Sequence, residues 1–226
     1  MITRRLPAGL ALTLAAAIAW PAFAQGVHPV TGRQIAQVMG HQGADWLDRP
    51  EREEEEAPSR AIALLDLAPG NVVADFGAGS GYMTVRLARA VGPGGRVFAV
   101  DIQPEMLALL TKRVDRETLT NVTTVLSTPD DPRLPDHALD LVLMVDVYHE
   151  LSQPQIVLRH LKQALKPSGR LVLLEYRKED PSIPIRPEHK MSVADAKAEL
   201  AAEGFALTAV KEDLPRQHVL IFTLAP

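Results

Sequence analysis

The stretch Val72-Val73-Ala74-Asp75-Phe76-Gly77-Ala78-Gly79-Ser80-Gly81 decides the fold of this chain. The β-branched pair Val72 and Val73 suits a buried strand, and the apolar run leads to an acid at Asp75. Three glycines follow at alternate positions, where they permit positive φ and let a ligand approach the backbone. An amphipathic helix then begins at about Tyr82, with its free N–H groups and positive dipole end toward the turn. The stretch predicts a strand, a tight turn and a helix that together suit a ligand.

The turn has a simpler interpretation, a tight connection between a strand and a helix that binds nothing. Dinucleotide-binding folds use the spacing G-x-G-x-x-G at such a turn. Here the third glycine comes one residue earlier, which gives G-x-G-x-G from Gly77 to Gly81. The choice between a bare turn and a ligand site therefore depends on the rest of the chain.

Length and composition limit the classes of protein to consider. The chain has 226 residues, of which 46% are hydrophobic, enough for one domain of ordinary size plus extra segments. Its net charge of −4 gives no basic footprint, so no nucleic acid is expected as a partner. The chain has no cysteine, which excludes disulfides, a thiolate metal site and a cysteine nucleophile.

Residues 1–24 are predicted to be a secretory signal peptide. Arg4 and Arg5 make a basic start, Leu10 to Trp20 is an apolar run without charge, and Ala22-Phe23-Ala24 is a small-x-small cleavage site. We expect cleavage after Ala24 and export to the periplasm, with no stable membrane span left in the mature chain. The apolar run is shorter than the roughly 20 residues that span a bilayer. An uncleaved anchor is the alternative.

Residues 25–58 form a polar lead-in. Thr31 to Met39 and Ala44 to Leu47 are expected to be short helices, and the acid run Glu51 to Glu56 is expected to be a solvated face. Trp46 has two interpretations: the lead-in folds over a cofactor pocket as a lid, or Trp46 simply packs on the main domain.

The main domain is predicted over residues 59–226, where strands alternate with helices. Five strands of this kind form a parallel sheet with helices on both faces. The last two strands follow each other without a helix, which implies a closing antiparallel pair. The first expected strand begins at residue 72, and the others cover 96–101, 122–126, 139–147, 170–176, 205–210 and 218–224. The expected helices cover 59–67, 82–91, 105–117, 155–165 and 192–203.

Polar residues gather after the predicted strands, where open α/β sheets bind their ligands. Asp75 and the glycines end the first strand. Asp101 ends the second, where a carboxylate can accept hydrogen bonds from both ribose hydroxyls of a cofactor. The residues that follow the third, fourth and fifth strands are Asp130 and Asp131; Asp146, Tyr148, His149 and Glu150; and Glu175, Tyr176 and Arg177.

From residue 61 to residue 224, this succession resembles the class I S-adenosylmethionine-dependent methyltransferases. The resemblance rests on the glycine turn, the acid Asp101, a loop acid before Leu134-Pro135, Asp146 at the end of the fourth strand, and the run Leu165 to Leu171. It is nearest to the small-molecule group that includes the quinone-biosynthesis and arsenite methyltransferases, although the chain has no cysteine for an all-thiol arsenite mechanism. It implies a Rossmann-like three-layer α/β sandwich with a mostly parallel seven-stranded sheet and a C-terminal antiparallel hairpin.

The resemblance also implies roles for individual residues. The Asp75 turn would hold the methionine part of S-adenosylmethionine, Asp101 the ribose, and either Asp130 or Asp131 the adenine amino group. Pro129 stands where the family often has glycine, which leaves that last choice open. Asp146 would border the methionine tail and the methyl group. The full cofactor-binding set is Asp75, Gly77, Ala78, Gly79, Gly81, Asp101, Ile102, Asp130, Asp131 and Asp146.

The expected reaction is in-line transfer of a methyl group to a small-molecule acceptor, with Asp146, Tyr148 and His149 as the catalytic set. Alignment supplies most of the acceleration, and a base is needed only if the acceptor arrives protonated. His149 is the predicted base, and a histidine hydrogen-bonded at a strand–loop junction is the alternative. No metal is predicted, because His28 and His41 have no partners at metal-ligand spacing.

Two other functions compete with methyl transfer. An exported protein that binds S-adenosylmethionine without catalysis is the alternative, because the cofactor is made in the cytosol. A nicotinamide oxidoreductase is disfavoured by the glycine spacing and the closing hairpin. The identity of the acceptor and the oligomeric state stay open.

Overall fold

The computed structural model describes residues 26–226. The predicted signal peptide, residues 1–24, lies outside the described residues. Among residues 26–226, no helix is both long enough and apolar enough to cross a membrane.

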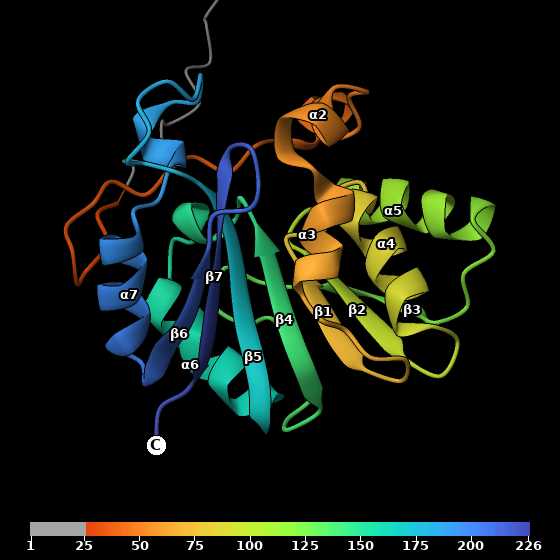
Figure 1. The fold of residues 1–226 in the computed structure, drawn as a ribbon. Helices are drawn as coiled ribbons and strands as arrows, with labels where there is room; N and C mark the ends of the chain where they lie inside the picture. The colour runs from red at the N-terminus through yellow and green to blue at the C-terminus, as the bar shows by residue number, and fades with distance from the viewer. Residues whose placement is uncertain (1–25) are drawn as a thin grey trace, which may run out of the picture.

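A single seven-stranded sheet forms the centre of the molecule, in the order β3-β2-β1-β4-β5-β7-β6 (Figure 1). The first five strands run parallel, and β7 is antiparallel to both β5 and β6. The predicted α/β fold with its C-terminal antiparallel hairpin is therefore confirmed. The strands are β1 (Val72–Phe76), β2 (Arg96–Asp101), β3 (Val122–Leu126), β4 (Leu139–Val145), β5 (Leu165–Tyr176), β6 (Phe205–Lys211) and β7 (Gln217–Leu224).

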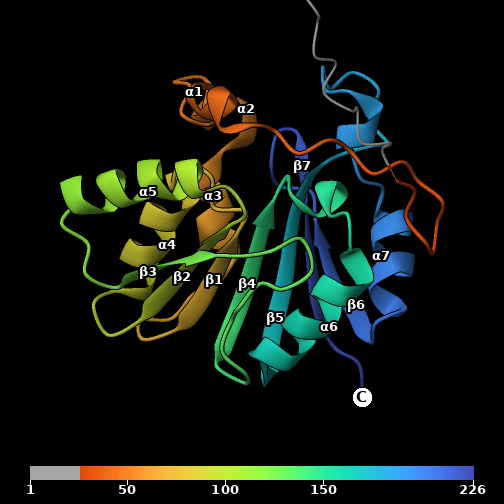
Figure 2. The same ribbon diagram turned by 180° about the vertical axis from the view of Figure 1, so that it is seen from behind.

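Alternate side chains of the central strands pack on opposite faces of the sheet, as the two-residue period of a strand requires. In β4, Leu141 and Leu143 join one apolar cluster, while Val142 and Met144 join the other. The first face carries α3 (Pro58–Leu64) and α4 (Tyr82–Val91), with α5 (Pro104–Arg116) beside them. The second carries α6 (Pro154–Ala164) and α7 (Val193–Ala201), in front of the sheet in Figure 2. These helices and the sheet make the three layers.

The glycine turn connects β1 to α4 beside the place where the strand order reverses, between β1 and β4. Gly77, Gly79 and Gly81 have φ of 77°, 53° and 84°, values that favour glycine. The N–H groups of Gly77 and Ala78 both donate to the carbonyl of Val100 in β2, which ties the turn to its neighbouring strand. The turn thus lies where doubly wound sheets bind ligands.

Two sequence predictions about secondary structure are wrong, one about a helix and one about the start of a strand. The helix expected over 31–39 is absent, because this segment closes a local hairpin in which Val27 pairs with Gln34. Strand β5 begins at Leu165 rather than at residue 170. A Cβ at Gly169 would lie 2.8 Å from the carbonyl oxygen of Leu139, so glycine allows the close approach of β5 to β4.

The lead-in contains a 3₁₀ helix η1 (His41–Gly43) and two short helices, α1 (Ala44–Leu47) and α2 (Arg52–Glu56). The helix expected at 44–47 is confirmed. The prediction that the acid run is a solvated face is confirmed for Glu51, Glu53 and Glu54, which are exposed. It is wrong for Arg52 and Glu56, which are only 6% and 3% exposed. The ion pair between them and the hydrogen bond that the Tyr176 hydroxyl in β5 donates to Glu56 satisfy these buried charges.

Candidate functional site

A cavity of about 820 Å³ lies beyond the carboxyl ends of β1, β2, β4 and β5. The sheet side contributes the glycine turn and the residues that follow the strands. The lead-in and the loop 184–189 supply the other walls. The lining includes Gln37, Val38, Met39, Gly40, Trp46, Leu47, Arg49, Arg52, Glu56, Phe76, Gly77, Gly79, Asp101, Ile102, Gln103, Met106, Ser127, Thr128, Pro129, Asp146, His149, Glu150, Tyr176, Pro184, Ile185, Arg186 and His189.

Asp101 lies at the end of β2, where its carboxylate joins the glycine turn to the start of α5. Its Oδ2 accepts a hydrogen bond from the Gly79 N–H at 2.8 Å, and its Oδ1 accepts one from the Gln103 N–H at 2.9 Å. Burial raises the pKa of Asp101. Since a carboxylate has about four lone-pair sites, both oxygens can still accept from a ligand.

The residues after β3 line the cavity differently from the sequence prediction. Ser127, Thr128 and Pro129 form the wall there, and the exposed side chain of Ile102 lines the same cavity. Neither of the two predicted loop acids lines the cavity. Asp130 accepts from the Thr128 hydroxyl at 2.7 Å, and Asp131 accepts from the Arg133 N–H at 2.7 Å. Both carboxylates therefore stabilise the loop itself.

Three other residues of the predicted cofactor set lie behind the cavity wall. Asp75 is 2% exposed and accepts from the Thr84 hydroxyl at 2.6 Å, while burial raises its pKa to about 6. Gly81 is the N-cap of α4, and the Ala78 side chain packs against α5. These residues shape the turn, and Gly77 and Gly79 present it to the cavity.

Asp146 follows β4 and lines the cavity in an unusual state. Its backbone has a φ of 54°, and its Oδ2 accepts from the Gln217 side-chain amide at 2.6 Å. Its Oδ1 is buried without a hydrogen-bond partner among residues 26–226. Burial, with the nearby carboxylates of Glu56 and Glu175, raises the pKa of Asp146 well above its usual value. A buried carboxylate oxygen without a donor marks a place for a ligand donor.

The lead-in is fixed over the cavity by buried charges. Arg52 donates to Glu56 at 2.7 Å, Arg49 also pairs with Glu56, and the Tyr176 hydroxyl donates to Glu56 at 2.6 Å. Trp46 lines the cavity with half its surface exposed, and the Arg49 guanidinium lies 3.8 Å from the centre of its ring. The lead-in is thus a wall of the cavity, which favours the first interpretation of Trp46.

The 3₁₀ helix η2 (Tyr148–Glu150) carries two of the predicted catalytic residues, Tyr148 and His149, but only His149 lines the cavity. Tyr148 is fully buried and does not line the cavity. Its hydroxyl lies 3.3 Å from Nε2 of His28, against the lead-in. The sequence-based assignment of Tyr148 to the catalytic set is not supported by this placement, because Tyr148 does not reach the cavity where an acceptor would bind.

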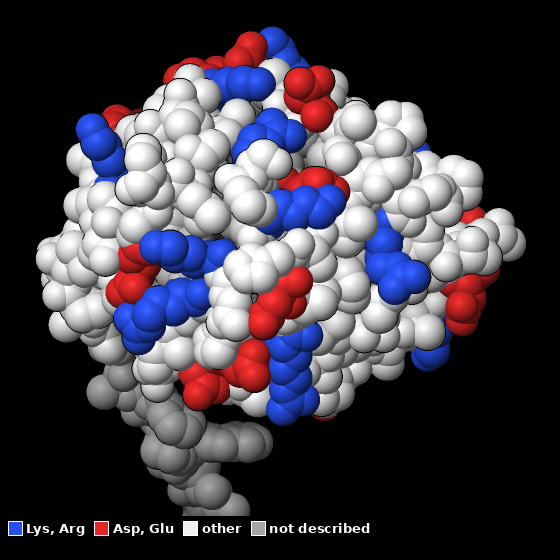
Figure 3. Space-filling model, turned by 90° about the horizontal axis from the view of Figure 1, so that it is seen from below, with Lys and Arg blue, Asp and Glu red and all other residues white. Residues whose placement is uncertain are grey.

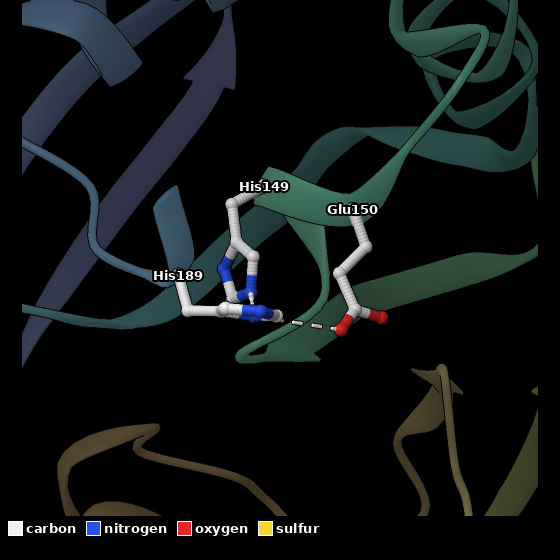
Figure 4. Close-up of side chains that lie close together, drawn as sticks. All are labelled: His149, Glu150 and His189. Atoms are coloured by element: carbon white, nitrogen blue, oxygen red, sulfur yellow. Dashed lines mark hydrogen bonds and ion pairs between the residues drawn. The ribbon is translucent and has the colours of Figure 1, made fainter. Parts of the chain in front are cut away.

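His149 and Glu150 line the cavity together with His189 from the 3₁₀ helix η3 (Pro187–His189), as Figure 4 shows. His149 Nδ1 lies 2.5 Å from Oε2 of Glu175, and its Nε2 lies 3.1 Å from Nδ1 of His189. Nδ1 of His189 lies 3.8 Å from Oε1 of Glu150. His189 is missing from the catalytic set predicted from the sequence, since 40 residues separate it from His149 and no local pattern pairs them.

The ionisation of this group follows from its burial. Burial lowers the pKa of His149, but the Glu175 carboxylate outweighs it, so the net shift is upward. Burial raises the pKa of Glu150 to about 7. Burial and the charge of His149 lower the pKa of His189. The site therefore holds a tight His149–Glu175 pair beside a second imidazole.

Figure 3 shows basic and acidic side chains next to each other across one face of the molecule. The two signs are interspersed there rather than gathered into one field.

Comparison with known proteins gives three kinds of match. Residues 73–169 match the family described as a methyltransferase domain. A ubiquinone/menaquinone biosynthesis C-methyltransferase of Hydrogenovibrio crunogenus is 34% identical over 124 residues, covering 52% of this chain and 47% of that protein. A demethylmenaquinone methyltransferase of Tropheryma whipplei is 37% identical over 116 residues, covering 51% of this chain and 46% of that protein. The chain thus spans about half the length of the curated relatives it matches.

A solved structure gives broader coverage. The crystal structure of a SAM-dependent methyltransferase from Aquifex aeolicus is 28% identical, with a TM-score of 0.77, over 84% of this chain and 100% of that one. These matches confirm the Rossmann-like fold and the resemblance to class I methyltransferases, and they support S-adenosylmethionine as the cofactor.

Proposed function

We propose that this protein transfers a methyl group from S-adenosylmethionine to a small-molecule acceptor. The proposal rests on the methyltransferase-domain match and on the cavity at the point where the strand order reverses. The observation that carries it is Asp146, which lines that cavity with a buried carboxylate oxygen that lacks a donor. The amino group of the cofactor's methionine part is a donor of the required kind.

The residues that would hold the cofactor come from three strand ends. Gly77 and Gly79 would admit the methionine part without a Cβ in the way. The Asp101 carboxylate would accept the ribose hydroxyls, since its oxygens are already oriented by two backbone N–H groups. The adenine would lie between Ile102 and the segment 127–129. This placement takes the adenine contact away from the side chains of Asp130 and Asp131.

The cofactor supplies a methyl group that its sulfonium already activates. The protein's part is to hold the acceptor in line and to exclude water. The lead-in serves both purposes, because Trp46, Leu47 and Arg52 cover the cavity opposite the sheet.

His149, the base predicted from the sequence, has no free ring nitrogen. Its Nδ1 faces Glu175 and its Nε2 faces His189. His149 would therefore take a proton from an acceptor only if His189 moved.

Calorimetric titration with S-adenosylhomocysteine, followed by turnover assays over a panel of small phenols, quinols and amines, tests the proposal. One-to-one binding with methyl transfer to at least one acceptor is expected. Binding without turnover on any acceptor would favour the non-catalytic alternative. Absence of binding by either form of the cofactor would contradict both.

We also propose that the protein is exported to the periplasm. The support is the basic start, the apolar run and the small-x-small site within residues 1–24. Mass spectrometry of the protein from the producing cell should find a chain that begins at Gln25. A chain with an intact Met1 in the cytosolic fraction would overturn this proposal and leave the enzymatic one untouched.

A further inference from the structure

We propose that His149, His189 and Glu150 bind one divalent transition-metal ion in the wall of the cavity. The three side chains come from η2 and η3, and Figure 4 shows them converging on a common point. One ligand atom from each residue lies within 4.8 Å of the other two. The site adds a cation to the proposed cofactor cavity, and its metal binding can be tested without assuming methyl transfer.

The distances suit a metal ion of ordinary size. Nε2 of His149 and Nδ1 of His189 are 3.1 Å apart. Two nitrogens at about 2.05 Å from one tetrahedral zinc ion would be about 3.3 Å apart, so the imidazoles need to separate only slightly. Oε1 of Glu150 is 3.8 Å from Nδ1 of His189, near enough to complete three protein ligands by a small side-chain rotation.

Glu175 gives this cluster the support that metal-binding histidines usually have. Its Oε2 lies 2.5 Å from Nδ1 of His149, and its Oε1 accepts from the Tyr148 N–H at 2.9 Å. The carboxylate fixes the ring so that Nε2 faces His189. A carboxylate hydrogen-bonded to the far nitrogen of a ligating histidine orients the ring and raises its basicity.

The charges around the cluster can accommodate a dication. Two carboxylates, Glu150 and Glu175, lie at or next to the ligand atoms and would offset the two positive charges. The opposing groups are Arg186, which lines the same cavity, and Arg33, which is paired with Glu199 and donates to the His149 carbonyl. The charge of Arg33 is thus already offset by Glu199.

The donor set narrows the choice of metal. Two imidazoles and one carboxylate suit zinc and neighbouring divalent ions such as Co²⁺ or Fe²⁺ better than Mg²⁺ or Ca²⁺, which prefer oxygen ligands. Three protein ligands leave a coordination position open, as in catalytic rather than structural zinc sites. Because all three residues line the cavity, that position is available to an oxygen or nitrogen atom of the acceptor.

The competing interpretation is a pair of histidines that share a hydrogen bond and bind no ion. The test is metal titration of the untagged, chelator-treated protein. Co²⁺ binding is followed by its visible absorption, and Zn²⁺ binding by competition with a chromophoric chelator. We expect one site per chain. His189→Ala removes a ligand on a partly exposed loop and should weaken Zn²⁺ binding by at least about 100-fold, more than loss of an outer-shell partner usually does.

His160→Ala is the matched control, because His160 is exposed on α6 and neither lines the cavity nor belongs to the cluster. It should bind Zn²⁺ as the unchanged protein does. Glu175→Gln keeps all three ligands and should weaken binding by about 10- to 100-fold. Far-ultraviolet circular dichroism establishes that each variant is folded.

Two outcomes would overturn the metal site. One is that the unchanged protein binds less than one Zn²⁺ per chain and that the His160→Ala and His189→Ala variants bind no differently from it. The other is full Zn²⁺ affinity in the His189→Ala variant. S-adenosylhomocysteine binding, measured on the same samples, separates this failure from that of the proposed function: cofactor binding without metal binding refutes only the metal site.

Discussion

The hydroxyl of Tyr176, at the end of β5, donates a hydrogen bond of 2.6 Å to Glu56 in α2, 120 residues away in the chain. Glu56 also pairs with Arg49 and Arg52, and all four side chains line the cavity. The carboxyl end of β5 and the lead-in are therefore joined through one carboxylate. Whatever loosens Glu56 should loosen the wall over the cofactor site.

Glu56→Ala should lower the free energy of unfolding by about 3 kcal/mol, because it leaves the buried Arg52 guanidinium without its carboxylate partner. Cofactor affinity should fall with it. Urea denaturation and calorimetric titration measure the two effects. Glu54→Ala is the control, since Glu54 is exposed in the same acid run and its loss should change stability by no more than about 0.5 kcal/mol. Equal stability of the two variants would refute the role of Glu56.

Asp101→Ala should weaken S-adenosylhomocysteine binding by about 1.5–3 kcal/mol, because it removes a charged acceptor of the ribose hydroxyls. Asp130→Ala is the comparison in the neighbouring loop, where the carboxylate is exposed and bonded to Thr128. It should bind nearly as tightly as the unchanged protein in calorimetric titration. If Asp130→Ala weakened S-adenosylhomocysteine binding as much as Asp101→Ala does, Asp130 would be the residue that contacts the adenine.

Asp75 makes stability depend on pH in the direction opposite to that of most carboxylates. Its folded-state pKa of about 6 lies above its ordinary value of 3.8, so the folded state binds the proton more tightly. The stability that this proton provides is present below about pH 4 and is lost as the pH rises through 6. At about 1.4 kcal/mol per pKa unit, the loss is on the order of 3 kcal/mol.

The Asp75→Asn variant cannot titrate at this position. Its unfolding free energy should therefore increase relative to that of the unchanged protein as the pH rises. The difference in unfolding free energy between the two should grow by about 2.4 kcal/mol from pH 4 to pH 7.5. Urea denaturation at both pH values measures it. A difference that stays constant would mean that the folded-state pKa of Asp75 is ordinary.

Most of the fold could be predicted from the sequence because its signals are local. The apolar runs of β1 and β4, the glycine turn and the helix periods each lie within about a dozen residues. The early start of β5 depends on a tertiary contact, since Leu165 pairs with Leu139 of β4 and regular pairing resumes only at Arg170. Local pattern gives no sign of that pairing.

The site was predictable where one strand end determines it, as for Asp101 and Asp146. It was not predictable where distant segments meet. Glu56 was assigned to a solvated acid run, because nothing in the sequence shows that Tyr176 and two arginines surround it. His189 reaches His149 from a proline-rich loop, so its nearness to Glu150 could not be read from spacing.

Trp46 offers a direct optical test of whether the lead-in contacts the bound cofactor. The chain has two tryptophans, Trp20 within the predicted signal peptide and Trp46 in the cavity wall. A chain that begins at Gln25 therefore has one tryptophan, half-exposed and stacked near Arg49.

Saturation with S-adenosylhomocysteine should change the intensity and wavelength of Trp46 emission, because filling the cavity removes water from the exposed side of the ring. The fluorescence titration should give the same dissociation constant as calorimetry. Trp46→Phe should abolish the optical signal and keep the heat of binding, since the ring lines the cavity without a hydrogen bond to the predicted cofactor residues. If calorimetry shows binding while Trp46 emission stays unchanged, the lead-in does not cover the bound cofactor. The second interpretation of Trp46, packing on the main domain, would then hold.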